Sequence, residues 1–475
     1  MAALSEDIFF SPIGVLNAKL RAREISAVEL ARAFAGRLAE LGPRYNAVAL
    51  PLTDLAVRRA REVDDEIRRG RLRGPLQGIP YGAKDLLSVA GRVTAWGAPP
   101  YAGQVFDYDA AVVRKLDRAG APLLAKLAMV ELAGAGGYRE ASASATGPGL
   151  NPWNIRRWAG GSSSGSAAAV AAGLVPFAIG SETWGSILTP CAFCGVTGLR
   201  PTYGLVSRYG AMPVAWSLDK IGPICRSAED CGHVLQVIAG GDSNDPASAG
   251  RGFYYTPQFA RKLSDLRVGF SPADLSEHVL PSSRPVFQAA LDVIRASGVQ
   301  LLETEFPDLP YEDAIVTILS AEASSAFEPL IESGRVEQLL DKNQIAGLRA
   351  GLEIPAKDYL RAMRIRSLVR RELRKLFVNV DLLISPSRFG VAPDVAEPLD
   401  RSRQSGRSPA PRGFASLSAA GNLAGLPALA LPCGFVDGLP VGLQIVGRPF
   451  TENAILALGV EFQRQTDWTR RRPEQ

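Results

Sequence analysis

Short apolar segments, separated by glycine turns and helical stretches, follow one another from Gly78 onward, and this alternation limits the possible folds most. Examples are "GIPYGAKDLLSV", "APLLAKLAMV", "LVPFAIGS" and "DLRVGFS", with a helical pattern at 285–296. Strands that alternate with helices favour a sheet covered by helices on both faces. We therefore predict an α/β fold, a single-domain α/β/α sandwich with a large mixed sheet.

The first 70 residues have a different, helical pattern. The stretch "ISAVELARAFAGRLAELGP" starts with Ser26 and Glu29 at the spacing of a capping box and stops at a Gly-Pro pair. A second helical pattern runs from about residue 55 to 69 and stops at Gly70. We predict one domain over 1–475, with an N-terminal helical segment at 1–70 and a catalytic core at 75–475.

Composition excludes several classes of protein. The 475 residues carry a net charge of +5, and 47% of them are hydrophobic, which is typical of a globular chain and does not demand a nucleic-acid or membrane surface as partner. No apolar run approaches the roughly 20 residues of a membrane helix. The N-terminus lacks a signal-peptide pattern and the five cysteines are an odd number. These features predict a cytoplasmic protein without a membrane segment.

Two serine-rich stretches, "GGSSSGSAAAVAAG" and "ETWGSILTP", raise the question of a base, because a serine hydroxyl needs one to become a nucleophile. Residues 161–165 match the G-x-S-x-G elbow, but the preceding "NIRRWAGG" is polar and broken by glycine, so the strand that the elbow needs is missing. His233 and His278 have no convincing carboxylate partner in the sequence around them. A Ser-His-Asp triad is therefore disfavoured.

Lysine is the remaining candidate base. Lys84 lies in "GIPYGAKDLLSVAG", a segment with the pattern of a buried strand. Burial lowers the pKa of a lysine, and neutral lysine can accept a proton. The alternative is a lysine that pairs with Asp85 or extends to the surface, and the local sequence alone favours that alternative.

Three long segments together resemble the amidase signature family. They are "GIPYGAKD", the stretch from "GGSSSGSAAAVAAG" to "GLRPTYGLVS", and "NLAGLPALALPCGFVDGLPVGLQIVGRPF". The resemblance implies a catalytic triad of Lys84, Ser162 and Ser186, with a cis peptide bond before Ser162. It also implies an oxyanion hole formed by backbone N–H groups of the turn Thr183, Trp184, Gly185 and Ser186. No cofactor and no metal are expected.

The chain departs from the family pattern at the nucleophile. The family reads Asp-x-Gly-Gly-Ser-Ile-Arg, whereas this chain reads "ETWGSIL" from Glu182 to Leu188. Trp184 replaces a glycine and would be strained if its φ were positive. Leu188 replaces an arginine, which suggests that packing or apolar substrate surface has taken the place of a polar network. We predict that the substrate pocket is lined by Met129, Gly136, Tyr138, Trp184 and Asn422.

The segment "GLVSRYGAMPVAWSLDKIGPICRSAED" resembles one subgroup, the glutaminase subunits of aminoacyl-tRNA amidotransferases. Trp184 and Leu188 nevertheless favour a stand-alone hydrolase of a small, relatively apolar amide, such as an aryl amide or a carbamate. The first alternative is a glutaminase subunit, with tRNA bound through partner subunits. The second is an inactive relative that only binds, and a homodimer is left open.

Three further features allow more than one interpretation. Cys191 and Cys194 form a C-x-x-C, but without a second pair they are expected to be small buried residues rather than metal ligands. The arginine-rich stretch "KDYLRAMRIRSLVRRELRKLF" is expected to be a solvated helix face, with an RNA or partner surface as the alternative. The polar segment 397–413 is expected to be a loop, either a lid or plain surface.

Overall fold

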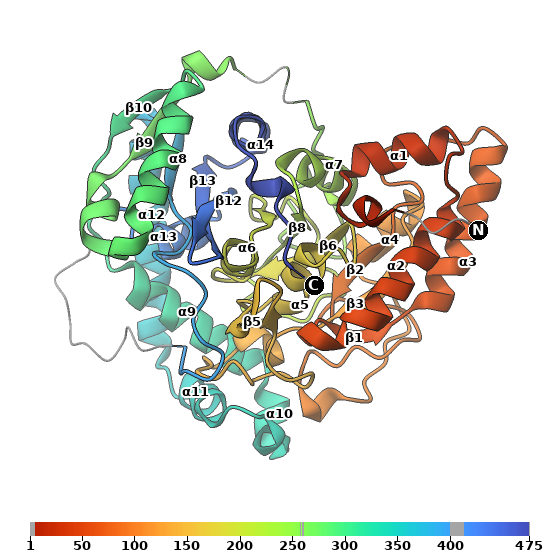
Figure 1. The fold of residues 1–475 in the computed structure, drawn as a ribbon. Helices are drawn as coiled ribbons and strands as arrows, with labels where there is room; N and C mark the ends of the chain where they lie inside the picture. Colours follow the sequence, from red (N-terminus) through yellow and green to blue (C-terminus); the bar gives the residue numbers. More distant parts are fainter. Residues whose placement is uncertain (1–4, 257, 259–260, 400–412, 475) are drawn as a thin grey trace.

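The computed structural model describes residues 5–256, 258, 261–399 and 413–474, and a large mixed β-sheet lies at its centre (Figure 1). The sheet has 11 strands in the order β1-β3-β2-β6-β8-β7-β12-β13-β11-β9-β10. Strand β2 is parallel to β3 and β6, and β9 is parallel to β10 and β11, whereas the other neighbours are antiparallel. The mixed sheet is therefore confirmed.

Strands from both halves of the chain build this sheet, so its middle joins segments that are distant in sequence. Its strands are β1 (Val48–Pro51), β2 (Tyr81–Lys84), β3 (Leu123–Leu127), β6 (Phe177–Glu182), β7 (Thr197–Arg200), β8 (Lys220–Cys225), β9 (Arg267–Phe270), β10 (Gln300–Glu303), β11 (Leu382–Pro386), β12 (Ala428–Val436) and β13 (Leu439–Gly447). A small separate hairpin is formed by β4 (Leu150–Asn151) and β5 (Asn154–Trp158).

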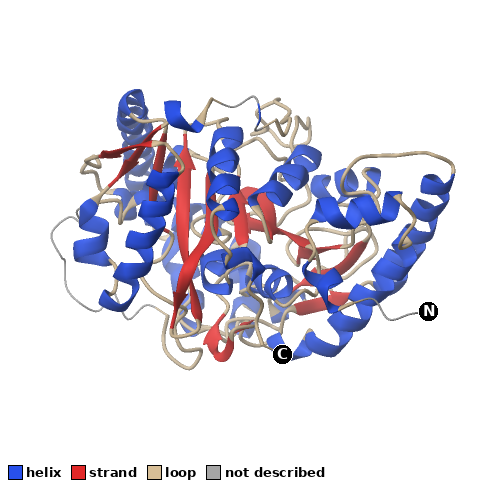
Figure 2. Ribbon diagram, turned by 45° about the horizontal axis from the view of Figure 1, so that its top comes forward, coloured by secondary structure: helices blue, strands red, loops and turns tan. Residues whose placement is uncertain are grey.

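Helices cover both faces of the sheet, as the alternating pattern predicts (Figure 2). They are α1 (Ile13–Arg21), α2 (Ala27–Leu41), α3 (Thr53–Arg68), α4 (Ala111–Arg118), α5 (Ser164–Ala171), α6 (Leu188–Cys194), α7 (Ala228–Ile238), α8 (Arg284–Ala296), α9 (Tyr311–Ala326), α10 (Glu328–Glu332), α11 (Lys342–Leu352), α12 (Ala356–Asn379), α13 (Leu417–Ala424) and α14 (Glu452–Arg464). The small side chains of α5 are all buried, which lets this helix pack closely against β6.

The N-terminal segment is helical with one exception. The Ser26 side chain accepts a hydrogen bond from the Glu29 N–H, and Glu29 bonds back to the Ser26 N–H, so the predicted capping box is present at the start of α2. The exception is β1, which the helical prediction for 1–70 missed. Strand β1 pairs antiparallel with β3, with an irregular register between Val48 and Leu50, and forms one edge of the sheet, so its conformation depends on a strand that comes much later in the chain.

The parallel strands β2 and β6 bring Lys84 and Glu182 to the same side of the sheet, at the carboxyl ends of the two strands. Strands β2 and β6 pair in register, with Tyr81 opposite Phe177, and they end at Lys84 and Glu182. Because parallel strands end on the same side, these two residues come together there. Strand β8 runs antiparallel to β6, so its first residue, Lys220, lies opposite Glu182.

Three further expectations concern a membrane helix, the loop at 397–413 and the basic stretch. Among the described residues, no helix is long and apolar enough to cross a membrane. Most of the predicted loop at 397–413 lies outside the described residues, because 400–412 are not described. The exposed arginines of the basic stretch lie along α12, the longest described helix, as its helical pattern predicts.

Candidate active site

Lys84 is fully buried and hydrogen-bonded to two serines. Its Nζ lies 2.7 Å from Ser162 Oγ and 2.9 Å from Ser181 Oγ. Burial lowers its pKa from 10.5 to about 7, although the carboxylates of Asp219 and Glu182 raise it. Lys84 can therefore lose its proton near neutral pH, which suits a general base.

Asp85 does not pair with Lys84. Its carboxylate lies 2.9 Å from the Nζ of Lys126, a second buried lysine, and also accepts the Ala95 N–H. Strand alternation explains this, because Lys84 and Asp85 are consecutive in the chain and point to opposite sides. The alternative in which Lys84 pairs with Asp85 therefore does not occur in the structure.

The segment around Ser162 lies directly beside the segment around Ser186. The peptide bond between Gly161 and Ser162 is cis, as the family resemblance implies. The N–H of Ser163 donates to the Ser186 carbonyl at 3.3 Å, and the Ser163 hydroxyl donates to the Ser181 carbonyl at 3.2 Å. The structure thus brings Lys84, Ser162 and the backbone of Ser186 together, although they are widely separated in sequence.

The turn 183–186 has its left-handed residue at a glycine. Gly185 has φ +82°, and Trp184 is not among the residues with positive φ. The strain considered for Trp184 therefore does not arise. Its indole is half-buried and packs against the main hydrophobic core, while Ser186 is 9% exposed. A tryptophan fits this position because only the next residue needs the conformation that glycine adopts freely.

The carboxylate of Glu182 holds the turn from behind. It accepts the N–H groups of Ile187 at 3.0 Å and Leu188 at 3.1 Å, at the start of α6. It also accepts Arg200 Nη1 at 2.8 Å and Asn422 Nδ2 at 3.1 Å. Burial alone would raise the pKa of Glu182, but Arg200 and Lys220 outweigh it and lower the pKa to about 2. Glu182 is therefore an ionised anchor with four donors.

Thr183 is held by Asp219, the last residue of the loop before β8, and by Lys220, the first residue of β8. The Asp219 carboxylate accepts the Thr183 hydroxyl at 2.6 Å and the N–H groups of Val214 and Ala215. The neighbouring Lys220 is buried, and its Nζ donates to Asn422 Oδ1 at 2.6 Å and to the Thr183 carbonyl at 3.4 Å. The first residue of the turn is thus fixed through both its side chain and its carbonyl group.

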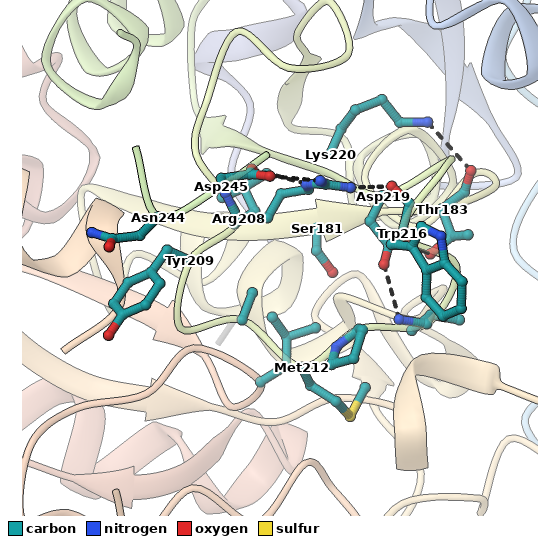
Figure 3. A pocket seen from close by; sticks show the side chains of 15 residues that line it. Ser181, Thr183, Arg208, Tyr209, Met212, Trp216, Asp219, Lys220, Asn244 and Asp245 are labelled. Atoms are coloured by element: carbon teal, nitrogen blue, oxygen red, sulfur yellow. Dashed lines mark hydrogen bonds and ion pairs between the residues drawn. The ribbon is translucent and has the colours of Figure 1, made fainter. Parts of the chain in front are cut away.

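A cavity of about 180 Å³ opens next to this cluster, at the hydroxyl of Ser181 (Figure 3). Its lining comprises Leu86, Ser181, Thr183, Arg208, Tyr209, Ala211, Met212, Pro213, Val214, Trp216, Asp219, Lys220, Ile221, Asn244 and Asp245. Arg208 at its rim is bound to Asp245. Since Ser181 also accepts a hydrogen bond from Lys84, a small molecule in this cavity would lie one hydroxyl group away from the candidate base.

The residues predicted to line the substrate pocket lie elsewhere around the serine segments. Met129 is fully buried, and Asn422 is fully buried in the network behind the turn. Gly136 has φ +83° and lies against α11, where a Cβ atom would come within 2.5 Å of the Gln344 carbonyl oxygen. The Tyr138 hydroxyl lies 3.0 Å from the position that a Cβ atom on Gly161 would occupy. Their role in binding substrate stays a prediction.

Several residues of the site were not found from the sequence. They are Ser181, Arg200, Asp219 and Lys220. Ser181 could have been found by pairing the strand that contains Lys84 with "LVPFAIGS", because both ends then meet at one edge. Lys220 and Arg200 carry no such signal, since their contacts depend on the register of antiparallel partners from later parts of the chain.

The histidines and cysteines do not join this cluster. His233 packs edge-on against Tyr255, and His278 lies against Phe389. Cys191 and Cys194 are buried free thiols, in agreement with the expectation for small core residues. No group of three or more metal-ligating side chains occurs in the part of the chain that the structure describes.

Comparison with known proteins gives a consistent result. The family model described as Amidase matches residues 29–456. Curated relatives include the A subunit of the glutamyl-tRNA(Gln) amidotransferase of Methylococcus capsulatus, which is 37% identical over 96% of this chain and 97% of the relative. The corresponding protein of Chloroflexus aggregans is 35% identical over 98% of this chain and 99% of the relative.

A solved structure agrees in fold and extent. The peptide amidase from Stenotrophomonas maltophilia is 33% identical, superposes with a TM-score of 0.83, and is covered over 98% of both chains. The match thus extends over nearly the whole of both chains. By family model, sequence and fold alike, the chain belongs to the amidase signature family of amide-cleaving hydrolases.

Proposed function

We propose that Ser186 is the nucleophile of amide hydrolysis and that Ser162 and Lys84 relay its proton. The observation that carries this proposal is the contact between Lys84 Nζ and Ser162 Oγ at 2.7 Å, made by a lysine whose pKa lies near 7. A buried neutral lysine that touches a serine hydroxyl is the base that the two serine-rich stretches need. Neither histidine supplies one.

The proposed reaction has two stages. The Ser186 oxygen attacks the carbonyl carbon, its proton passes to Ser162, and the Ser162 proton passes to Lys84. When the C–N bond breaks, the relay runs backwards and gives the departing nitrogen a proton, so that an amine or ammonia leaves instead of an amide anion. Water then attacks the acyl-enzyme ester by the same relay and releases the acid and the free Ser186.

The negative oxygen of the tetrahedral intermediate needs donors, and backbone N–H groups of the turn 183–186 are proposed to supply them. The Glu182 carboxylate supports this role because it accepts the N–H groups of Ile187 and Leu188, just after the turn. It does not bind the N–H groups within the turn. Asp219 and Lys220 support it by fixing Thr183. Loss of one donor in such sites costs about 3 kcal/mol of transition-state stabilisation.

From the sequence, a stand-alone hydrolase of a small apolar amide is the first interpretation, and a glutaminase subunit is its alternative. The curated relatives, which are named as amidotransferase A subunits and match over nearly the entire chain, favour the alternative. We therefore propose glutamine as the first substrate to test. In that reaction the side-chain amide yields ammonia for a partner protein, and tRNA would be bound through such partners.

Two observations keep an apolar amide as the second candidate. The cavity next to Ser181 has apolar walls that include Leu86, Met212 and Trp216, and Leu188 is buried where the family pattern has an arginine. The solved structure that matches 98% of this chain is named as a peptide amidase, so at least one relative that matches over nearly the whole chain is named for a peptide substrate. A homodimer and a cytoplasmic location stay predictions.

A substrate panel tests the proposal. It contains glutamine, an aryl anilide, an aliphatic amide and a carbamate, each offered to the wild type, Ser186→Ala and Lys84→Ala, with the exposed serine variant Ser367→Ala as matched control. Turnover that is lost in the first two variants and kept in the control supports the relay. Turnover that survives in Ser186→Ala refutes it. Glutamine alone as substrate identifies the glutaminase, and turnover of the apolar members identifies the stand-alone hydrolase.

A serine-reactive covalent probe distinguishes an enzyme from an inactive binding relative. Labelling of Ser186 in the wild type, lost in Lys84→Ala, is expected because the relay activates the hydroxyl. A folded protein that is not labelled and hydrolyses nothing would instead be the binding relative.

A further inference from the structure

Helix α12 carries a concentration of positive charge on its solvent side. Every basic side chain of the helix except Arg366 is exposed. The exposed cations are Lys357, Arg361, Arg364, Arg370, Arg371, Arg374 and Lys375. Only two carboxylates, Asp358 and Glu372, lie on the same helix, so these residues together leave an excess of five positive charges. The net charge of the whole chain is also +5, so this one helix accounts for the excess of the entire protein.

Most of these cations have no anionic partner in the protein. Glu372 forms ion pairs with Arg371 and Lys375. The other five exposed cations form no ion pair through their side chains with any residue that the structure describes. The arginines of α3 differ, because that helix contains five carboxylates and pairs Arg59 with one of them. The unpaired charges of α12 are therefore available to an anionic ligand.

Five of the cations form one straight row. The intervals between its members are four, three, seven and four residues, which places them on a single face of an α-helix: Lys357, Arg361, Arg364, Arg371 and Lys375. The buried apolar residues of α12 lie on the opposite face. At the rise of an α-helix the row is about 27 Å long, which corresponds to roughly eight nucleotide steps along one strand of a duplex.

The inner face of α12 fixes this row on a rigid support. Arg366 points inward, and its guanidinium donates to the carbonyl groups of Leu423 at 2.8 Å and Ser217 at 2.6 Å. The hydroxyl of Tyr359 donates to the Glu322 carboxylate at 2.8 Å, which ties α12 to α9. Because the backbone that carries the cations is already ordered, binding a ligand costs little additional backbone entropy.

An anionic membrane, an acidic protein and a nucleic acid all carry complementary charge, and the structure favours the third. A helix that binds a membrane surface buries its apolar face in lipid, whereas α12 buries its own in the protein. The centre of a protein interface is apolar, and α12 exposes only two large apolar side chains, Leu360 and Val378. Five of the seven exposed cations are arginines, which bind phosphate groups through two parallel N–H bonds.

We propose that the outer face of α12 binds RNA through the phosphate backbone, without preference for base sequence. The row consists of cations that neutralise phosphates, and phosphate contacts carry no sequence information. The choice of RNA over DNA rests on the proposed function, in which partner proteins bind tRNA. Helix α12 adds a direct contact between this chain and that RNA.

Fluorescence anisotropy of the full chain with a labelled RNA hairpin tests the inference. Five phosphate contacts predict a slope of about −4 when the logarithm of the affinity constant is plotted against the logarithm of the salt concentration, so binding should weaken about 100- to 500-fold between 50 and 200 mM KCl. The triple variant Arg361→Gln/Arg364→Gln/Arg371→Gln should reduce the slope to about −2 and the affinity at 50 mM KCl about a hundredfold, because three contacts are lost.

A matched control removes the same number of charges elsewhere. The variant Arg58→Gln/Arg61→Gln/Arg69→Gln changes three exposed arginines in and just after α3, and it should bind the RNA hairpin as the wild type does. The competing probes are a DNA hairpin of the same sequence, polyglutamate and phosphatidylserine vesicles. The RNA hairpin is expected to bind at least as tightly as each of them.

Four results would overturn the inference. They are a wild type that does not bind the RNA hairpin at 50 mM KCl, a triple variant of α12 that binds it as tightly as the wild type, a control that loses as much affinity, and tighter binding of a competing probe. Anisotropy requires no turnover, so these results do not depend on amide hydrolysis. The triple variant of α12 should hydrolyse a neutral amide as the wild type does, and a failure of the proposed relay would leave RNA binding unchanged.

Discussion

Replacement of Lys84 by methionine is expected to stabilise the protein at neutral and acidic pH while it abolishes amide hydrolysis. Lys84 is fully buried, and burial lowers its pKa from 10.5 to about 7 against the opposing effect of Asp219 and Glu182. The lowered pKa measures the free energy needed to keep this side chain protonated inside the fold. A difference of about 3.5 pKa units corresponds to about 5 kcal/mol.

The sign of the pH dependence follows from where the proton is bound. Between about pH 7 and 10.5 the unfolded chain holds the Lys84 proton and the folded chain does not, so the free energy of unfolding of the wild type rises with pH. Below about pH 7 both states are protonated and the whole penalty applies. Methionine has no such proton. The difference in unfolding free energy between wild type and Lys84→Met should therefore change by about 2.5 kcal/mol between pH 6 and pH 9.

Urea-induced unfolding of both proteins at pH 6, 7, 8 and 9 measures this difference. The lost contacts of Lys84 with Ser162 and Ser181 shift it by a constant amount and cancel from its slope. Lys357→Met, at an exposed lysine of α12, is the control and should show no comparable slope. A difference that stays flat over this range would mean that Lys84 keeps its proton in the fold, and the reasoning that makes it a general base would fail.

Three further predictions concern the same site. The kcat/KM for a neutral amide should rise with pH through about 7 and then level off, because only neutral Lys84 accepts a proton; a profile that falls with rising pH contradicts the relay. Glu182→Gln should lower the unfolding free energy by about 3 kcal/mol, because it breaks a buried ion pair and turns an N–H₂ group towards donors. Urea-induced unfolding measures this, with the exposed variant Glu353→Gln as control. An unchanged unfolding free energy would refute the role of Glu182 as an ionised anchor of the turn. Thr183→Val should reduce kcat roughly tenfold with little change in KM, because Asp219 then no longer holds the turn through the Thr183 hydroxyl; steady-state kinetics with an unchanged kcat would exclude this role.

The elements that could be predicted from sequence are those whose signals are local. Helix α2 has its capping box and its apolar spacing within one stretch, and β2, β3, β6 and β9 have continuous apolar runs bounded by glycine turns. Strand β1 could not be predicted in this way. Its sequence, "VALP", has too few residues for a periodic pattern, and it becomes a strand because β3 supplies the hydrogen-bonding partner.

The same difference between local signals and long-range contacts applies to the residues of the candidate site. Lys84 and the serines of the glycine-rich stretches could be named from sequence because the family resemblance covers them. Arg200 and Lys220 could not, since an arginine in "GLRPTYG" and a lysine in "SLDKIGP" look like ordinary loop residues. Their significance depends on partners from distant parts of the chain, and only the folded chain brings Arg200 to Glu182 and Lys220 to Asn422.

Position 188 shows why a local substitution does not by itself remove a polar network. From the sequence, the loss of an arginine there suggests that packing has replaced polar contacts. Leu188 is indeed buried, yet its N–H still binds Glu182, and Glu182 remains an ionised carboxylate. The cations that compensate it are Arg200 and Lys220, which reach it from β7 and from the start of β8. A buried carboxylate needs a compensating positive charge, but this charge can come from any strand. The polar network around Glu182 therefore persists without an arginine at position 188, because the sheet brings other cations close enough.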